Sequence, residues 1–259
     1  MENNMEIYTP GFSQFDFTRK LCNLVFLVDI TVGIHKDSRI ENINEAFLQM
    51  IPILRQIQMD DMSEIEYKIS IMIFDQDSYW HVLPTTIMEY DHILIHSGGK
   101  EVNYEKAFIK LNEKLTKKEF FAHDGKFAEP IIVLLMGSEM GESGYDDALK
   151  SLYDNGWFKA SRRYAVFADK AILNSKKVYE FCRIFVTDYG ENIIHEINKN
   201  TLSEIIMDYT DCRWRNHHIL TGFRKEEDIS DSSNDEIFYD PEAIVQEWVN
   251  MDFKDEDFI

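Results

Sequence analysis

Short apolar runs alternate along the chain with stretches in which apolar residues recur every three or four positions. The runs are rich in β-branched residues and have the length of strands whose two faces are both covered in a parallel sheet. They span residues 24–30, 67–74, 130–136, 163–168 and, more weakly, 192–197. A further run at 78–83 follows Asp75-Gln76-Asp77 and predicts a hairpin, which would place one antiparallel strand in the sheet.

The intervening stretches have helical spacing. The longest, residues 38–57, carries apolar residues on one face and follows a helix-start candidate at Asp37 or Ser38. Pro52 lies inside it and predicts a kink or local irregularity. Further helical patterns lie at 103–115, 146–153, 176–181 and 202–209. This alternation predicts an α/β domain with a doubly wound, mostly parallel central sheet, one antiparallel edge strand and helices on both faces.

Length and composition add the domain organisation. A chain of 259 residues, 44% of them hydrophobic, is long enough to bury a core of its own. We expect one domain at residues 21–224, preceded by an N-terminal segment at 1–20 and followed by an acidic C-terminal tail at 225–259.

Charge and cysteine usage exclude several classes of function. The net charge of −20 opposes a nucleic-acid partner, because every phosphate contact would form against the overall field. Cys22, Cys182 and Cys212 are odd in number and widely spaced, so neither a disulfide framework nor a zinc site is indicated. There is no signal-peptide pattern at the start and no apolar stretch long enough for a membrane span. We therefore expect a soluble, cytoplasmic protein.

The first apolar run ends on a charged residue. Asp29 closes the run, and Thr31 and Gly33 follow at steps of two. In a sheet of this kind, ligands gather at the carboxyl ends of the strands. Oxygen atoms of carboxylates and hydroxyls on one tight loop are the ligands that hard cations prefer. The spacing therefore marks Asp29 as a candidate site residue.

This pattern resembles the von Willebrand factor A (vWA) domain, whose first strand ends in D-x-S-x-S at a metal-ion-dependent adhesion site. The stretch "HSGGKEVNYEKAF" is similar to the loop that carries the family's metal-binding threonine, and "PIIVLLMGSEMGESGYDDALKSL" is similar to the strand that ends in T-D-G. The resemblance covers about residues 20–212. It extends to the bacterial TerY type, which is associated with tellurium resistance and related stress systems and has S-G-G-T and L-L-T-D-G-x-P-T-D at these points.

Several positions depart from the family's metal-binding pattern. Gly33 has no side-chain oxygen, Lys100 stands where the threonine is expected, and Gly137 stands where the aspartate is expected. A one-residue shift would bring Ser138 or Glu139 to the aspartate's place, but a lysine repels the cation that it would have to help bind. We therefore predict a degenerate site with no metal ion and no other cofactor.

Two arrangements of Lys100 remain open from the sequence. Its ammonium group can stand in for the missing cation and offset the charge of Asp29. Alternatively, Lys100 points to solvent and Asp29 binds backbone amides of its loop.

The remaining residues that could carry out chemistry have structural interpretations. Asp75 and Asp77 fit turn chemistry, and His217-His218 fit a solvated surface. The stretch Ser97 to Lys100 lacks the spacing of a phosphate-binding loop, and no nucleophile with a neighbouring base is visible.

These observations favour a non-catalytic adaptor or scaffold that binds proteins. The resemblance to the TerY type implies a bacterial stress-response or defence system, with a phosphatase and a kinase as protein partners. One alternative is a small-ligand-binding protein or enzyme in which Asp29, Lys100 and Glu139 converge. A second is a metal-dependent vWA protein binder with a different ligand set.

The acidic tail also carries large apolar residues. Residues 225–259 contain thirteen acidic and two basic residues, a net charge of −11. Asp240-Pro241-Glu242 is a typical helix start, and it predicts a short amphipathic helix at 241–250. The apolar residues of its docking face are Ile244, Val245, Trp248 and Val249. Because so short a helix is marginal in water, we expect it to dock on this domain or on a partner, with a disordered tail as the third alternative.

Truncation after Arg224 separates these three outcomes. Loss of thermal stability identifies docking on the domain, which we expect because exposed apolar residues promote aggregation. Loss of partner binding at unchanged stability identifies a docking motif for a partner. No change in either measurement contradicts both forms of docking.

Overall fold

The computed structural model describes residues 19–31, 38–59, 65–120, 126–138, 145–167, 172, 175–187, 192–194 and 197–220, with 211–220 described by their backbone alone. Six strands form one sheet in the order β3-β2-β1-β4-β5-β6. All neighbouring strands are parallel except β2 and β3, so the predicted antiparallel edge strand is confirmed. The strands are β1 (Lys20–Asp29), β2 (Ile65–Phe74), β3 (Ser78–Thr86), β4 (Ile131–Met136), β5 (Arg162–Phe167) and β6 (Ile193–Ile194).

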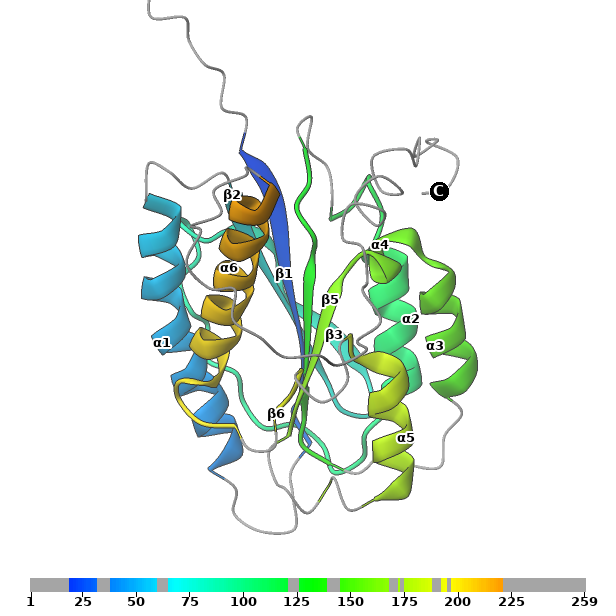
Figure 1. Cartoon of the computed structure of the whole chain (residues 1–259). Helices are drawn as coiled ribbons and strands as arrows, with labels where there is room; N and C mark the ends of the chain where they lie inside the picture. The colour runs from blue at the N-terminus through cyan, green and yellow to red at the C-terminus, as the bar shows by residue number, and fades with distance from the viewer. Residues whose placement is uncertain are drawn as a thin grey trace, which may run out of the picture.

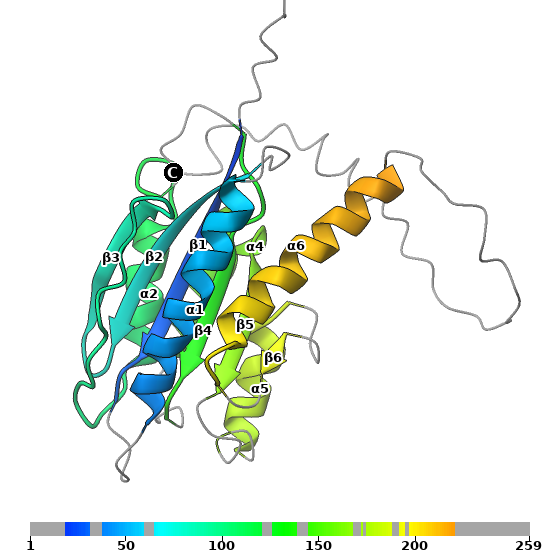
Figure 2. The same cartoon turned by 90° about the vertical axis from the view of Figure 1, so that its left-hand side faces the viewer.

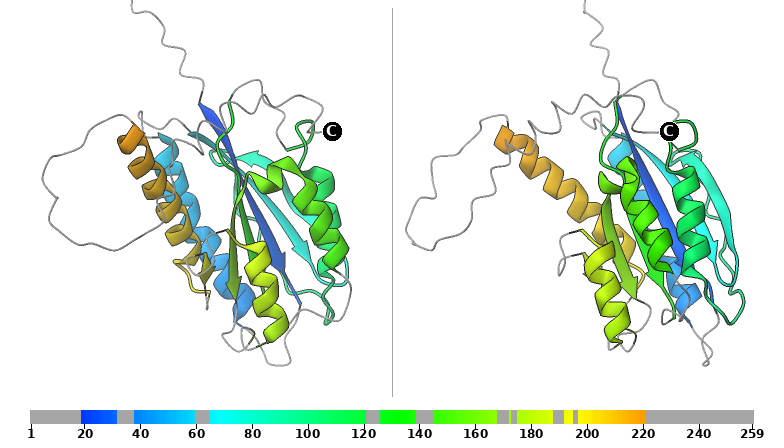
Figure 3. Two further views of the ribbon diagram at one scale, coloured as in Figure 1. Left: turned by 45° about the vertical axis from the view of Figure 1, so that its right-hand side comes forward. Right: turned by 90° about the vertical axis from the view of Figure 1, so that its right-hand side faces the viewer.

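Helices cover both faces of the sheet (Figure 1, Figure 3). On one face lie α1 (Arg39–Met59) and α6 (Thr201–Leu220), and on the other lie α2 (Tyr104–Lys114), α3 (Tyr145–Asp154), the short α4 (Gly156–Lys159) and α5 (Lys176–Phe185). Residues of β1 alternate between the two cores, with Leu24 and Phe26 in the α1 core and Val25 and Leu27 in the α2 core. This alternation confirms that β1 is buried on both faces.

The elements predicted between residues 24 and 209 all occur in the structure, several with longer bounds and the last strand with the shorter bounds Ile193–Ile194. The helix expected at 202–209 continues to Leu220 and projects beyond the sheet (Figure 2), and α4 was not anticipated by the periodicity. The helix α1 continues through Pro52, from Arg39 to Met59, so the kink or irregularity predicted there does not end the helix. Pro52 lies on the exposed side of the helix, where water can bind the carbonyl that its missing N–H leaves open.

Several expectations fall outside the described residues. They include the whole tail at 225–259, with its helix at 241–250 and the docking residues Ile244, Val245, Trp248 and Val249. The side chains of Cys212, His217 and His218 are likewise not described. No described helix is both long enough and apolar enough to pass through a lipid bilayer.

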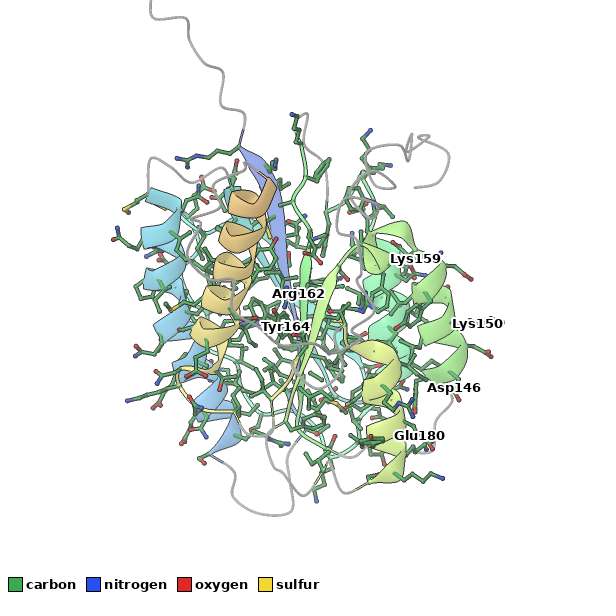
Figure 4. All side chains as sticks on the ribbon, in the orientation of Figure 1. Asp146, Lys150, Lys159, Arg162, Tyr164 and Glu180 are labelled. Atoms are coloured by element: carbon green, nitrogen blue, oxygen red, sulfur yellow. The ribbon has the colours of Figure 1, made fainter. Side chains whose placement is uncertain are left out.

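Charged side chains cover the helices of the α2 face. Asp146, Lys150 and Glu180 point away from the body and are exposed (Figure 4). Exposed charged side chains of this kind are typical of a surface in contact with solvent.

The winding of the sheet reverses between β1 and β4. Strands β2 and β3 lie on one side of β1, and β5 and β6 lie beyond β4. In doubly wound sheets, the carboxyl ends of the two strands at this reversal open a crevice in which ligands bind. Asp29 ends β1, and Gly137 and Ser138 directly follow β4. The chain's topology therefore brings these three residues to one place.

The loop at 97–100 is fastened to the β2–β3 turn. The Asp75 carboxylate accepts hydrogen bonds from the amides of Asp77, at 3.0 Å, and of Gly99, at 2.7 Å. The amide of Gly98 donates to the carbonyl of Ile30 at 2.7 Å. Asp75 therefore shapes a turn and holds a neighbouring loop, as expected for a structural residue.

Gly98→Ala should lower the free energy of unfolding by about 1–3 kcal/mol, because an added methyl group overpacks this contact. A Cβ atom at Gly98 would lie 2.5 Å from Asp75 Oδ2 and 2.6 Å from Ile30 Cδ1. Gly99→Ala is the matched control, since its Cβ would lie 3.2 Å from its nearest neighbour, Asp75 Oδ2. Urea unfolding of both variants measures the difference, and equal losses would contradict the packing argument.

Candidate functional site

The carboxylate of Asp29 is fully buried and surrounded by hydrogen-bond donors. Its Oδ1 accepts from the Thr31 amide at 2.9 Å and from the Thr31 hydroxyl at 2.6 Å. Its Oδ2 accepts from the Ser138 hydroxyl at 2.6 Å, the Gly137 amide at 3.1 Å and the Tyr104 hydroxyl at 3.4 Å. Five donors engage the lone pairs of the two oxygens, so the charge is stabilised without contact with water.

Tyr104 closes the site from the α2 side. It is the first residue of α2, which begins there because the Asn103 side chain accepts a hydrogen bond from the Lys106 amide at 2.9 Å. Burial, and then the negative charge of Asp29, raise the pKa of Tyr104 well above its usual value. The hydroxyl therefore keeps its proton and remains a donor, shared between Asp29 and the Ser138 carbonyl.

A buried arginine lies on the other side of the same loops. Arg39 is the first residue of α1, and only 4% of its surface is exposed. Its guanidinium donates through Nη1 to the Gly137 carbonyl and through Nη2 to the Thr31 carbonyl. These are the two residues whose amides donate to Asp29. Asp29 and Arg39 therefore hold the ends of β1 and β4 together, one by their N–H groups and the other by their C=O groups. We refer to this arrangement as the strand-end clamp.

Gly137 and Arg39 depend on each other. A Cβ atom at Gly137 would overlap Nη1 and Cζ of Arg39. The guanidinium thus fills the space into which any side chain at residue 137 would extend. The sequence resemblance to vWA domains predicts an aspartate at residue 137, and the guanidinium of Arg39 lies where that side chain would extend.

The structure brings together Asp29, Thr31, Gly137 and Ser138 from the predicted site. Gly33 and Glu139 lie outside the described residues. Ser138 does reach the strand end, as its one-residue shift from the aspartate position suggested, but it donates to Asp29 instead of facing a cation.

Lys100 is not part of this group. Its side chain is exposed and borders a polar hollow of about 400 Å³ that Asp75, Asp77 and Glu101 also line. The bonds that fasten Gly98 and Gly99 to Ile30 and Asp75 hold the loop over the β2–β3 turn. The hypothesis that Lys100 pairs with Asp29 is therefore wrong, and among the described residues Arg39 supplies the buried positive charge instead.

Sequence reasoning missed Arg39 and Tyr104. Arg39 did leave a signal, because a cation in the first turn of a helix opposes the helix dipole and so needs another reason to be there. Tyr104 gives no such signal in the sequence, because aromatic residues at the start of a helix commonly pack in the core.

The described residues do not fit a divalent metal. The carboxylate of Asp29 is already engaged by donors, Gly137 offers no side chain, and Lys100 lies elsewhere. No cluster of three or more histidine, cysteine or acidic side chains suited to a metal occurs among the described residues. A cation would have to displace the guanidinium of Arg39 as well as the donor hydrogens.

Comparisons with known proteins bear on the fold alone. No family model and no curated protein sequence matches the chain. The solved structures that it resembles include proximal thread matrix protein 1 from the mussel byssus, with 10% identity and a TM-score of 0.47, covering 72% of this chain and 46% of that one. The ArnB paralog VWA2 from Sulfolobus acidocaldarius has 15% identity and a TM-score of 0.43, covering 71% of this chain and 44% of that one. BatB from Bacteroides thetaiotaomicron has 13% identity and a TM-score of 0.46, covering 75% of this chain and 99% of that one.

The chain spans less than half the length of the first two of these proteins. The sheet order and the clamp define a doubly wound α/β domain whose switch point is filled by its own side chains.

Arg39→Met should lower the free energy of unfolding by about 2–4 kcal/mol, because two carbonyls lose their charged donors. Arg55→Met is the matched control. Arg55 also donates to two carbonyls, those of Ile87 and Tyr90, but 32% of its side chain is exposed and water can replace it. We expect the control to lose about 1 kcal/mol or less. Equal losses in urea unfolding at neutral pH would contradict a special role for Arg39.

Proposed function

We propose that this chain is a non-catalytic, metal-independent protein-interaction module built on a vWA-type domain. The observation that carries the proposal is the closed strand-end clamp at the position where such a sheet holds its ligand. A site filled by five donors and a guanidinium has no open coordination position and no accessible reactive group. The geometry therefore best supports a role in which the surface around this closed site binds another protein.

The enzymatic alternative has little support in the geometry. It requires Asp29, Lys100 and Glu139 to converge, yet Asp29 is buried and Lys100 faces the Asp75 turn. Burial raises the pKa of Cys182 to about 12, so this thiol is a poor nucleophile at neutral pH. The metal-dependent alternative meets the obstacle of Arg39 described above.

The biological setting of the proposal rests on sequence resemblance. Similarity to the TerY type favours a bacterial stress-response or defence system, in which the module would bridge protein partners such as a phosphatase and a kinase. The clamp is compatible with a scaffold because it makes the strand-end surface independent of metal supply.

Partner capture with the full chain should be the same in magnesium and in EDTA. Magnesium or manganese at a hundredfold excess over a native-state Kd would add about 2.7 kcal/mol of stability, and we expect no such rise in the thermal midpoint. Arg55→Met, which changes a residue with no contact to the clamp, is the control for a general change in stability. Capture that EDTA abolishes, or a metal-dependent rise in thermal midpoint, would overturn metal independence, and turnover of a small molecule would overturn the non-catalytic proposal.

A further inference from the structure

A groove runs beside the clamp along the first half of α1. It has a volume of about 640 Å³, with Thr31 and Arg39 at its floor. One wall is the outer side of α1 with Glu41, Glu45 and Leu48, and the other is the segment 94–97 with Leu94. We call it the α1 groove. Its volume lies in the range of ligand-binding clefts.

The two walls are held at a fixed separation by Asn44. The Asn44 amide group donates to the Ile95 carbonyl at 2.9 Å, and its oxygen accepts from the Ile95 amide at 2.9 Å. His92 adds a contact of 2.9 Å to the same oxygen and stacks on Phe47. The groove is therefore already formed before any partner arrives, which lowers the cost of binding.

The surface of the groove combines apolar rims with negative charge. Leu48 is 52% exposed and Leu94 is 55% exposed, each on one rim. Glu41 and Glu45 are exposed and lie one turn apart, and Leu48 continues the same face of α1. Neither glutamate forms an ion pair with a described residue. The positive charge of Arg39 is buried beneath them and bonded to two carbonyls.

We propose that the α1 groove binds a basic amphipathic helix of a partner protein. Its lysine or arginine residues, one turn apart, would face Glu41 and Glu45, and an apolar side chain beside them would insert between Leu48 and Leu94. This assignment rests on the proposed interaction function and names the chemistry of the partner that the function requires.

Charge selects this occupant over the chain's own acidic tail. The tail at 225–259 has a net charge of −11 and would be repelled by the two glutamates. A second copy carries −20 overall, although residues 213–225 include Arg213, Arg215, Arg224 and Lys225. Self-association therefore has to be measured directly.

The test uses the full chain and two fluorescein-labelled helical peptides, one with leucine and lysine at helical spacing and one with glutamate in place of lysine. Fluorescence anisotropy at low salt should show binding of the lysine peptide only. Glu41→Lys with Glu45→Lys should weaken it about tenfold or more, and Leu48→Ser should weaken it without any change in charge. The control Asp147→Lys with Asp154→Lys makes the same change in net charge on exposed positions of α3 and should leave the affinity close to that of the parent.

Several outcomes would overturn the proposal. If the α3 control weakened binding of the lysine peptide by the same factor, the binding would be non-specific attraction to an acidic chain, and the α1 groove would not be the site. Tighter peptide binding by Trp248→Ser would identify the tail as the occupant, and self-association that is lost in the Glu41 and Glu45 variant would identify a second copy. Partner capture that is unchanged by the Glu41 and Glu45 variant would overturn the α1 groove assignment while leaving the interaction function in place. Unchanged thermal midpoints confirm that each variant is folded.

Discussion

The strand-end clamp is the interaction on which the rest of this structure depends. Asp29 binds the amides of Thr31 and Gly137, and Arg39 binds their carbonyls, so one negative and one positive group fix both strand ends at the switch point. Asp29 is fully buried, and only 4% of the surface of Arg39 is exposed. Burying either charge alone would be costly, and together with the backbone groups between them they form a hydrogen-bonded unit with no net charge. The crevice that the topology creates is thereby converted into part of the core.

If the chain binds a partner as proposed, this arrangement places recognition beside the strand ends and not at them. The floor of the α1 groove is the outer side of the same clamp, since Thr31 and Arg39 belong to both. The fixed floor and the Asn44 bridge give α1 and the segment 94–97 a constant geometry. In the proposed interaction, specificity would reside in the exposed side chains of Glu41, Glu45 and Leu48, which can change without disturbing the fold.

The alternation of apolar patterns predicted the strands, their faces and the antiparallel edge, because these follow from burial and local spacing. Sequence also placed Asp29, Thr31, Gly137 and Ser138 at one edge. The sequence also suggested Lys100 as the cation near Asp29, because Lys100 stands at a metal-ligand position of the vWA motif that the chain resembles. The true cation, Arg39, comes from the next helix and reaches the site only through tertiary packing. The Gly98 and Gly99 contacts that direct Lys100 elsewhere are equally invisible in the sequence.

The steric link between Gly137 and Arg39 has an evolutionary consequence. An aspartate at 137 would enter the space of the guanidinium, and loss of the guanidinium would leave two carbonyls without their donors. Each substitution is harmful unless the other is already present, and the two positions are 98 residues apart in the chain. A side chain at residue 137 therefore requires a smaller residue at 39, and a smaller residue at 39 requires new donors for the two carbonyls. We expect the two positions to co-vary in an alignment of homologous sequences, although they are far apart in the chain.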